Sequence, residues 1–162
     1  MKTDQFAFFY GGALSQWAPS PFTLDEVEYS TAEQYMMAMK ADYFNDQDTK
    51  AKIMATDSPS EQKSLGRMVK NFNAEAWNAV SRGFVYKANI AKFTQNDWCM
   101  KELERTGDLE IVEASPYDRI WGIGLGTSDK RALDKTQWLG TNWLGETLMK
   151  VRKDLREQNS RV

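Results

Sequence analysis

Residues 30–44 read STAEQYMMAMKADYF and carry the clearest helical pattern in the chain. Apolar side chains recur there at the three- and four-residue spacing of one helical face, which we expect to pack into the core. They are Ala32, Met36, Met39 and Tyr43. Ser30 suits the N-cap, where a side-chain oxygen accepts a hydrogen bond from a backbone N–H of the first turn. The pattern predicts a helix with one buried face.

Two interpretations apply to Glu33 in this helix. It lies three residues after Ser30, the spacing of a capping box, and this pattern alone favours a role at the helix start. Glu33 also shares a stripe with Met37 and Lys40, offset by about 100° from the core face. Seven rises of about 1.5 Å would separate Glu33 and Lys40 by about 10 Å along the axis. Such a stripe suits a solvated surface. It equally suits a site in which one of the two groups acts at a sugar carbon and the other holds a phosphate.

Outward from this helix, the sequence predicts a helix-dominated α+β fold with a few short strands. Strands are expected at 5–10, near 28–29 and at 109–115. Helices are expected over about 47–55, 59–69, 74–92 and 145–157. Ser58 marks the start of the second of these and Asn73 caps the third. One more helix is expected to have Thr94 as its cap and to stop at Gly107. At this length and with 41% hydrophobic residues, we expect residues 1–162 to form one domain.

The composition excludes several classes of chemistry. The chain has no histidine and a single cysteine, Cys99, so it lacks the commonest general base and the commonest metal ligand. A serine or cysteine nucleophile would lack its usual base, and we expect neither a metal nor a cofactor. Carboxylates remain, and they suit the cleavage of glycosidic bonds through an oxocarbenium-like transition state.

Charge and hydropathy indicate where the protein acts. The N-terminal segment lacks the long apolar run of a secretory signal, and no stretch approaches the roughly 20 apolar residues of a membrane span. A cytoplasmic location without membrane contact is therefore expected. The net charge of −2 lacks the basic excess of duplex binders, so any contact with nucleic acid would be local.

Three further features each have a plain structural alternative. Asp118 follows Pro116-Tyr117, a setting in which aspartate often bonds to its own backbone. Trp77 and Trp121 would by default be core or edge aromatics. The segment GIGLG, residues 122–126, lacks the third glycine of a dinucleotide fingerprint, so it indicates either a tight turn or a loop close to a ligand.

Taken together, these segments resemble the NADAR superfamily, which includes YbiA-like proteins, over nearly the whole chain. The segments that carry the resemblance are, in order, FFYGGALSQWAPSPF, YSTAEQYMMAMKA, LGRMVKNF, Trp77 with KFTQN, TGDLEIVEAS, YDRIWGIG and WLGTNWLGETLMKVR. The combination is specific, although each segment alone is weak. The resemblance implies a YbiA-like fold and the hydrolysis of N-glycosides of ribose without a metal.

The resemblance also implies a set of site residues. Glu33 matches the family's helix glutamate and Asp118 the aspartate of its D-x-x-W-G segment, and these two are the expected catalytic residues. Trp77 and Trp121 would wall the pocket, and Lys40 and Arg67 would meet phosphate. The expected substrate-binding residues are Trp77, Trp121, Lys40, Gln34, Arg67, Gly122 and Phe9. Glu33 should turn away from the Ser30 backbone, toward a pocket shared with Asp118 and Trp121.

Members of the family act in two settings, on ADP-ribosylated guanine, including guanine in DNA, or on phosphoribosylamino-pyrimidine intermediates of riboflavin biosynthesis. Riboflavin-type members carry Glu-His and Trp-Gly-Asp-Gly where this chain has Glu33-Gln34 and Trp121-Gly122-Ile123-Gly124. Glutamine cannot become a cation. These departures favour removal of ADP-ribose from guanine, with a transient contact to ADP-ribosylated DNA. Riboflavin intermediates, or ADP-ribose binding without cleavage, are the alternatives.

Overall fold

The computed structural model describes residues 1–160, which divide into two compact units. One unit is formed by Met1–Ser15 together with the chain from Met100 onward, and the other by Gln16–Cys99. Helices dominate and the strands are short, which confirms the predicted α+β class. None of the helices within residues 1–160 has the length and apolar character that crossing a bilayer requires. A single domain over 1–162 stays a prediction.

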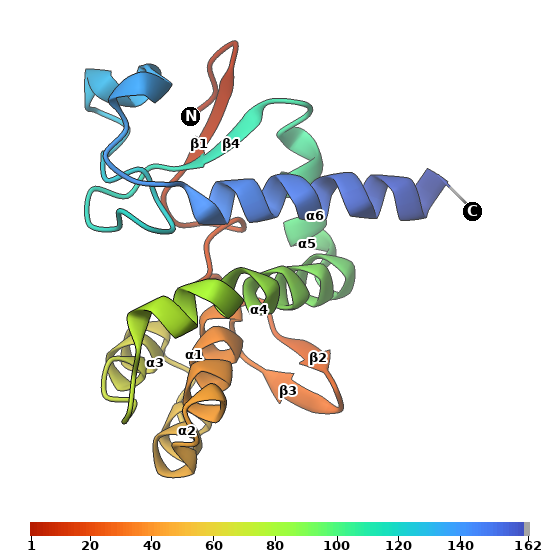
Figure 1. Ribbon diagram of the computed structural model, residues 1–162. Helices are drawn as coiled ribbons and strands as arrows, with labels where there is room; N and C mark the ends of the chain where they lie inside the picture. The colour runs from red at the N-terminus through yellow and green to blue at the C-terminus, as the bar shows by residue number, and fades with distance from the viewer. Residues whose placement is uncertain (161–162) are drawn as a thin grey trace. The chain divides into compact units, whose positions relative to one another are not determined.

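The unit Gln16–Cys99 is a helical cluster with one hairpin. Strands β2 (Phe22–Leu24) and β3 (Val27–Tyr29) pair antiparallel, and β3 confirms the strand expected near 28–29. The helices are α1 (Ala32–Tyr43), α2 (Gln47–Met54), α3 (Pro59–Gly66) and α4 (Ala74–Gln95). Helix α1 packs against each of the other three (Figure 1). It is therefore the central element of this unit.

The start of α1 differs by one residue from the prediction. Thr31, not Ser30, is the N-cap, and its hydroxyl oxygen accepts a hydrogen bond from the Gln34 N–H at 3.0 Å. The Gln34 side chain in turn accepts a bond from the Ser30 N–H at 2.7 Å. The capping-box interpretation of Ser30 and Glu33 is thus wrong, because the pattern is shifted by one residue and Gln34 takes the place of the glutamate.

The single buried face predicted for α1 is also too simple. Every residue from Ala32 to Ala38 is buried, because α1 has helices on several sides. Tyr43, expected in the core, is instead 45% exposed at the C-terminal end of the helix. An apolar stripe of helical period is typical of a helix that packs on a core with one face. Helix α1 instead lies inside the core and is buried on several faces.

Other helix boundaries differ from the prediction for local reasons. Helix α4 begins after the predicted cap Asn73 but runs on to Gln95, so Thr94 lies inside it and caps nothing. The Thr94 hydroxyl donates to the Ile90 carbonyl oxygen at 2.7 Å, the usual back-bond of a threonine within a helix. The next helix, α5, spans Asp97–Arg105. Helix α3 ends at Gly66, earlier than expected.

The other unit is built on two parallel strands. Strand β1 (Phe6–Phe9) pairs with β4 (Glu110–Glu113), and both lie within the predicted strand segments. Helix α6 (Trp143–Ser160) packs on β4, while the short 3-10 helices η1 (Lys130–Leu133) and η2 (Lys135–Gln137) precede it. The core of this unit comprises Phe6, Phe8, Val112, Ala114, Ile123, Leu125 and Ala132.

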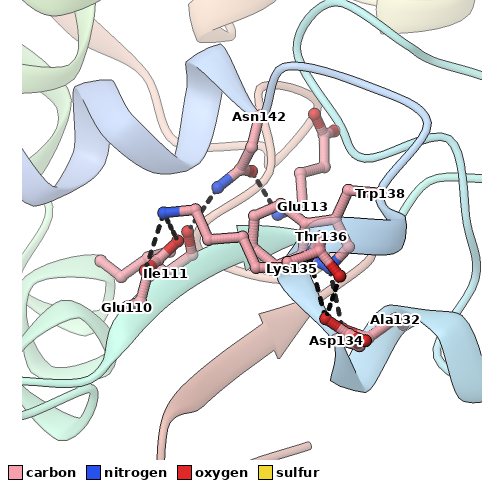
Figure 2. Close-up of polar contacts among 9 residues, drawn as sticks. All are labelled: Glu110, Ile111, Glu113, Ala132, Asp134, Lys135, Thr136, Trp138 and Asn142. Carbon is pink, nitrogen blue, oxygen red and sulfur yellow. Dashed lines mark hydrogen bonds and ion pairs between the residues drawn. The ribbon is translucent and has the colours of Figure 1, made fainter.

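Asn142 joins α6 to the free edge of β4 (Figure 2). Its side-chain oxygen accepts from the Glu113 N–H at 3.0 Å, and its amide donates to the Ile111 carbonyl oxygen at 2.9 Å. The side chain thereby takes the place of a neighbouring strand. Gly145, near the start of the helix, lies so close that a Cβ there would be 2.1 Å from the Ile111 carbonyl oxygen.

Candidate active site

Glu33 occupies the second position of α1 and is 7% exposed. Its backbone N–H donates to the Gln16 carbonyl oxygen at 3.0 Å, which ties the helix start to the preceding loop. Since Gln34 bonds to the Ser30 N–H, the Glu33 carboxylate is not required at that position. A nearly buried carboxylate at a helix N-terminus is a candidate for chemistry.

Two cations accompany this carboxylate. Burial lowers the pKa of Lys40, the nearby Glu33 carboxylate raises it, and the Arg67 guanidinium lowers it further. Lys40 is therefore electrostatically coupled to both groups. The packing of α3 on α1 explains this grouping, since a Cβ on Gly66 would lie 2.0 Å from the Met37 sulfur. Met37 and Gly66 thus bring Arg67, the C-cap of α3, beside the stripe predicted for Glu33 and Lys40.

An aromatic group lies at the other end of the same stripe. The Lys40 ammonium is 4.3 Å from the centroid of the Phe72 ring, a cation–π distance. Trp77 stacks on Phe84 with centroids 5.7 Å apart and contacts Tyr43 at 6.3 Å. Because Trp77 is only 5% exposed, most of its surface serves the core, and its contact with substrate stays a prediction.

Gln34 holds the helix start together rather than offering its amide to solvent. It is 2% exposed, and its amide nitrogen donates to the Ile53 and Thr56 carbonyl oxygens, each at 3.1 Å. Its oxygen accepts from the Ser30 N–H and hydroxyl at 2.7 and 3.1 Å. Both amide hydrogens and both acceptor positions are thereby used inside the protein. Substrate binding by Gln34 stays a prediction.

A separate cavity of about 520 Å³ opens on the hairpin side of α1. Its lining comprises Trp17, Pro19, Pro21, Glu28, Ser30, Thr31, Gln34, Met54, Asp57 and Pro59. Glu33, Lys40 and Arg67 do not line it. Its charged residues, Glu28 and Asp57, are acidic and would repel a phosphate. The candidate catalytic carboxylate and this cavity are therefore different features.

In the other unit, Asp118 has the structural role that its turn-like sequence suggests, because its side chain bonds to the nearby backbone. One of its carboxylate oxygens accepts from the Ile120 and Trp121 N–H groups at 2.9 and 2.8 Å. Trp121 is half-buried and meets Trp143 edge-on, with centroids 5.7 Å apart. Asp118 thus fixes the conformation of the loop that presents Trp121. Catalysis by Asp118 stays a prediction.

The remaining two predicted binding residues of this unit are tightly packed. A Cβ on Gly122 would lie 3.0 Å from the backbone oxygens of Asp118 and Glu113, so its lack of a side chain permits close backbone packing. Phe9, at the end of β1, is 8% exposed, and its carbonyl oxygen accepts from the Ala114 N–H at 2.8 Å. Both positions shape the backbone, and their contact with substrate stays a prediction.

Three residues that support these features escaped the sequence analysis. Gln62 is fully buried and bonds to Thr31, the N-cap of α1. Asn142 holds the edge of β4, and Phe72 lies against Lys40. The sequence holds a weak signal only for Asn142, an asparagine directly before a helix. Among the residues that the structure describes, no three His, Cys, Asp or Glu side chains gather in a way that would hold a metal.

Known proteins resemble this chain over almost all of its length. It is 41% identical to N-glycosidase R617 of Acanthamoeba polyphaga mimivirus, with 95% of this chain and 98% of the relative covered. It is 30% identical to N-glycosidase Npun_R5314 of Nostoc punctiforme, with 90% and 86% covered. Protein irg-1 of Caenorhabditis elegans is 37% identical, with 95% and 81% covered.

A solved structure and a family model also match this chain. The NMR structure of the E. coli protein YbiA superposes with a TM-score of 0.80 at 26% identity, covering 100% of this chain and 91% of that one. The NADAR domain model matches residues 8–156. Both the predicted family and the predicted YbiA-like fold are thereby confirmed, and the chain belongs to the NADAR domain family.

Proposed function

We propose that this protein removes ADP-ribose from ADP-ribosylated guanine by hydrolysing the bond between the ribose C1 and the base nitrogen. The coarser activity is shown by its relatives: the chain is a hydrolase of N-glycosidic bonds, as are the family members named N-glycosidases. The observation that carries the proposal is the grouping of the Glu33 carboxylate with Lys40 and Arg67 on one unit.

Glu33 supplies the chemistry at the sugar. As the C1–N bond breaks, positive charge develops on C1 and the ring oxygen, and a nearby carboxylate stabilises that charge. Water adds its hydroxyl to C1, its remaining proton goes to the departing base nitrogen, and no bond to the protein is needed. Burial strengthens the interaction because the surroundings of Glu33 screen charge poorly.

Lys40 and Arg67 hold the phosphate of the substrate. Their two positive charges outweigh the single negative charge of Glu33, so an anion binds beside them. The predicted separation of about 10 Å along α1 places the phosphate apart from the carbon at which Glu33 acts. This arrangement fits a sugar phosphate whose C1 carries a base.

The preference for guanine rests on the departures at Gln34 and Ile123 from the riboflavin-type motifs. Roles for Asp118, Trp121, Trp77, Gly122 and Phe9 in holding sugar and base rest on the family motif and belong to the same proposal. The cytoplasmic location and the contact with ADP-ribosylated DNA belong to it as well. The choice among substrates is open to a direct assay.

The test is a parallel incubation of the protein with ADP-ribosylated guanosine, ADP-ribosylated DNA and phosphoribosylamino-pyrimidine intermediates. Products are resolved by chromatography with mass detection. The proposal predicts release of free ADP-ribose from one or both guanine substrates. Cleavage of the pyrimidine intermediates alone would make the riboflavin alternative correct. Binding of ADP-ribose with no cleavage of any substrate would identify a binding module.

A further inference from the structure

An aromatic shelf adjoins Lys40, the residue at the proposed phosphate end of the Glu33–Lys40 stripe. We define the shelf as Tyr43, Phe44 and Phe72. The rings of Tyr43 and Phe44 meet edge-on at 5.1 Å, and those of Phe44 and Phe72 meet edge-on at 5.5 Å. The Lys40 ammonium lies 4.3 Å from the centre of the Phe72 ring. The shelf therefore begins where the proposed phosphate site ends.

Two of the three rings of the shelf are exposed, and the third, Phe44, is half-buried between them. Tyr43 is 45% exposed and Phe72 is 46% exposed, although burial of such side chains is strongly favourable. Nearby in sequence, Met68 is 65% exposed. Single exposed apolar residues need no explanation, but two exposed rings that a third ring joins, beside a cation, indicate a binding surface. Flat rings next to positive charge match a nucleobase next to phosphate.

We propose that the aromatic shelf stacks a second nucleobase, one that lies on the far side of the substrate's phosphate from the bond that is cleaved. This inference rests on the proposed function and specifies its substrate class. Along α1, Lys40 lies about 10 Å and Tyr43 about 15 Å from Glu33, from rises of about 1.5 Å per residue. A ligand held at Glu33 and Lys40 reaches the shelf at Phe72, whose ring lies against the Lys40 ammonium.

The shelf would distinguish the proposed ADP-ribosyl substrate from the alternative phosphoribosyl substrate. An ADP-ribosyl group carries a base beyond its phosphates, which the shelf stacks. A phosphoribosyl group ends at its phosphate and leaves the shelf uncovered. Stacking on Phe72 therefore contributes to the binding of ADP-ribose and not to that of a simple ribose phosphate. Phe72 is in this account a specificity-determining residue.

The experiment compares the binding of two ligands, ADP-ribose and ribose 5-phosphate, by calorimetry to the wild type and to Phe72→Ala. Phe72→Ala removes the ring on which the base would stack, and loss of this stacking interaction is expected to weaken ADP-ribose binding by about 5- to 150-fold. Because Phe72 also contacts Lys40, part of any loss reflects the phosphate site. Ribose 5-phosphate measures that part, and the ratio of the two affinities reports stacking alone.

Three further variants support the comparison. Phe72→Trp keeps a flat ring and should retain the wild-type ratio, whereas Phe72→Leu keeps apolar bulk without a ring and should behave as Phe72→Ala does. Trp98→Ala removes an equally exposed aromatic, 48% exposed and away from the shelf in sequence, and should change neither affinity. Circular dichroism confirms that each variant folds.

The outcomes separate this inference from the proposed function. An unchanged affinity ratio in folded Phe72→Ala and Phe72→Leu, in an enzyme that still cleaves ADP-ribosylated guanosine, would overturn the shelf and leave the function intact. A wild type that binds ribose 5-phosphate as tightly as ADP-ribose would also overturn the shelf. A wild type that neither binds ADP-ribose nor cleaves the guanine substrate would overturn both.

Discussion

Replacing Gln62 by leucine should substantially destabilise the protein, because this one amide joins three segments. Gln62 lies in α3 and is fully buried. Its oxygen accepts from the Thr31 hydroxyl at 2.6 Å, and its nitrogen donates to the Ser30 hydroxyl at 3.0 Å and the Thr56 carbonyl oxygen at 2.8 Å. Leucine has a similar size but offers none of these bonds.

The expected loss follows from these three bonds. Each contributes about 1 kcal/mol net to folding, and the Thr31 hydroxyl, which loses its acceptor, costs about 1–3 kcal/mol more. The Thr56 carbonyl oxygen and the Ser30 hydroxyl keep their hydrogen bonds to the Gln34 side chain. The leucine side chain offsets part of this by burying more apolar surface, worth about 1–2 kcal/mol. We therefore expect the free energy of unfolding to fall by about 3 kcal/mol. A chain of this size should then lose roughly 10 °C in Tm.

The assay is urea unfolding followed by tryptophan fluorescence and far-UV circular dichroism. Gln47→Leu is the matched control, since Gln47 is exposed and its side-chain amide donates to the Asp42 carboxylate at 2.8 Å on the surface. The control should change the free energy of unfolding by about 0.5 kcal/mol or less. A loss below about 1 kcal/mol in Gln62→Leu, or one equal to that of the control, would refute the reasoning.

Two further predictions concern backbone packing and a buried charge. Gly145→Ala should destabilise the protein by about 2 kcal/mol or more in urea unfolding, because its Cβ would lie 2.1 Å from the Ile111 carbonyl oxygen, whereas Gly83→Ala, with nothing within 4 Å, should stabilise it by about 0.5–1 kcal/mol. Equal effects of the two would contradict this account. Burial lowers the pKa of Lys92 from 10.5 to about 8. As pH rises, the folded state therefore releases the Lys92 proton before the unfolded state does. The free energy of unfolding should accordingly increase as pH rises from about 8 to 10. Lys92→Met should lack that contribution, and identical pH dependence in the two proteins would show that Lys92 is not the group responsible.

Local capping signals in the sequence correctly predict where several helices begin. Asn73 accepts from the Ala76 N–H at 2.9 Å and Ser58 from the Glu61 N–H at 3.3 Å, as their positions in sequence predict. The prediction for Thr94 is wrong because the same residue type is also tolerated inside a helix, where its hydroxyl bonds backward. The prediction for Tyr43 is wrong because the buried surroundings of α1 do not extend to its last turn. Sequence spacing holds no information on where a neighbouring helix ends.

The candidate site is predictable from the sequence only in part. Glu33 and Lys40 lie on one helix, so their relation follows from helical geometry, and their electrostatic coupling agrees with it. Arg67 is expected near phosphate only from the family resemblance. Its coupling to Lys40 depends on how α3 packs on α1. Phe72 lies 32 residues beyond Lys40 in sequence, and no local pattern indicates that they touch.

The most direct test of the account is the turnover of Glu33→Gln on ADP-ribosylated guanosine, measured as the rate of ADP-ribose release. Glutamine keeps the size of the side chain and removes its negative charge, so the fold should persist while kcat falls by about 10²-fold or more. Glu75→Gln, an exposed change in the first turn of α4, is the control and should keep wild-type turnover. Turnover in folded Glu33→Gln equal to that of the wild type would contradict the assignment of Glu33 as the catalytic carboxylate.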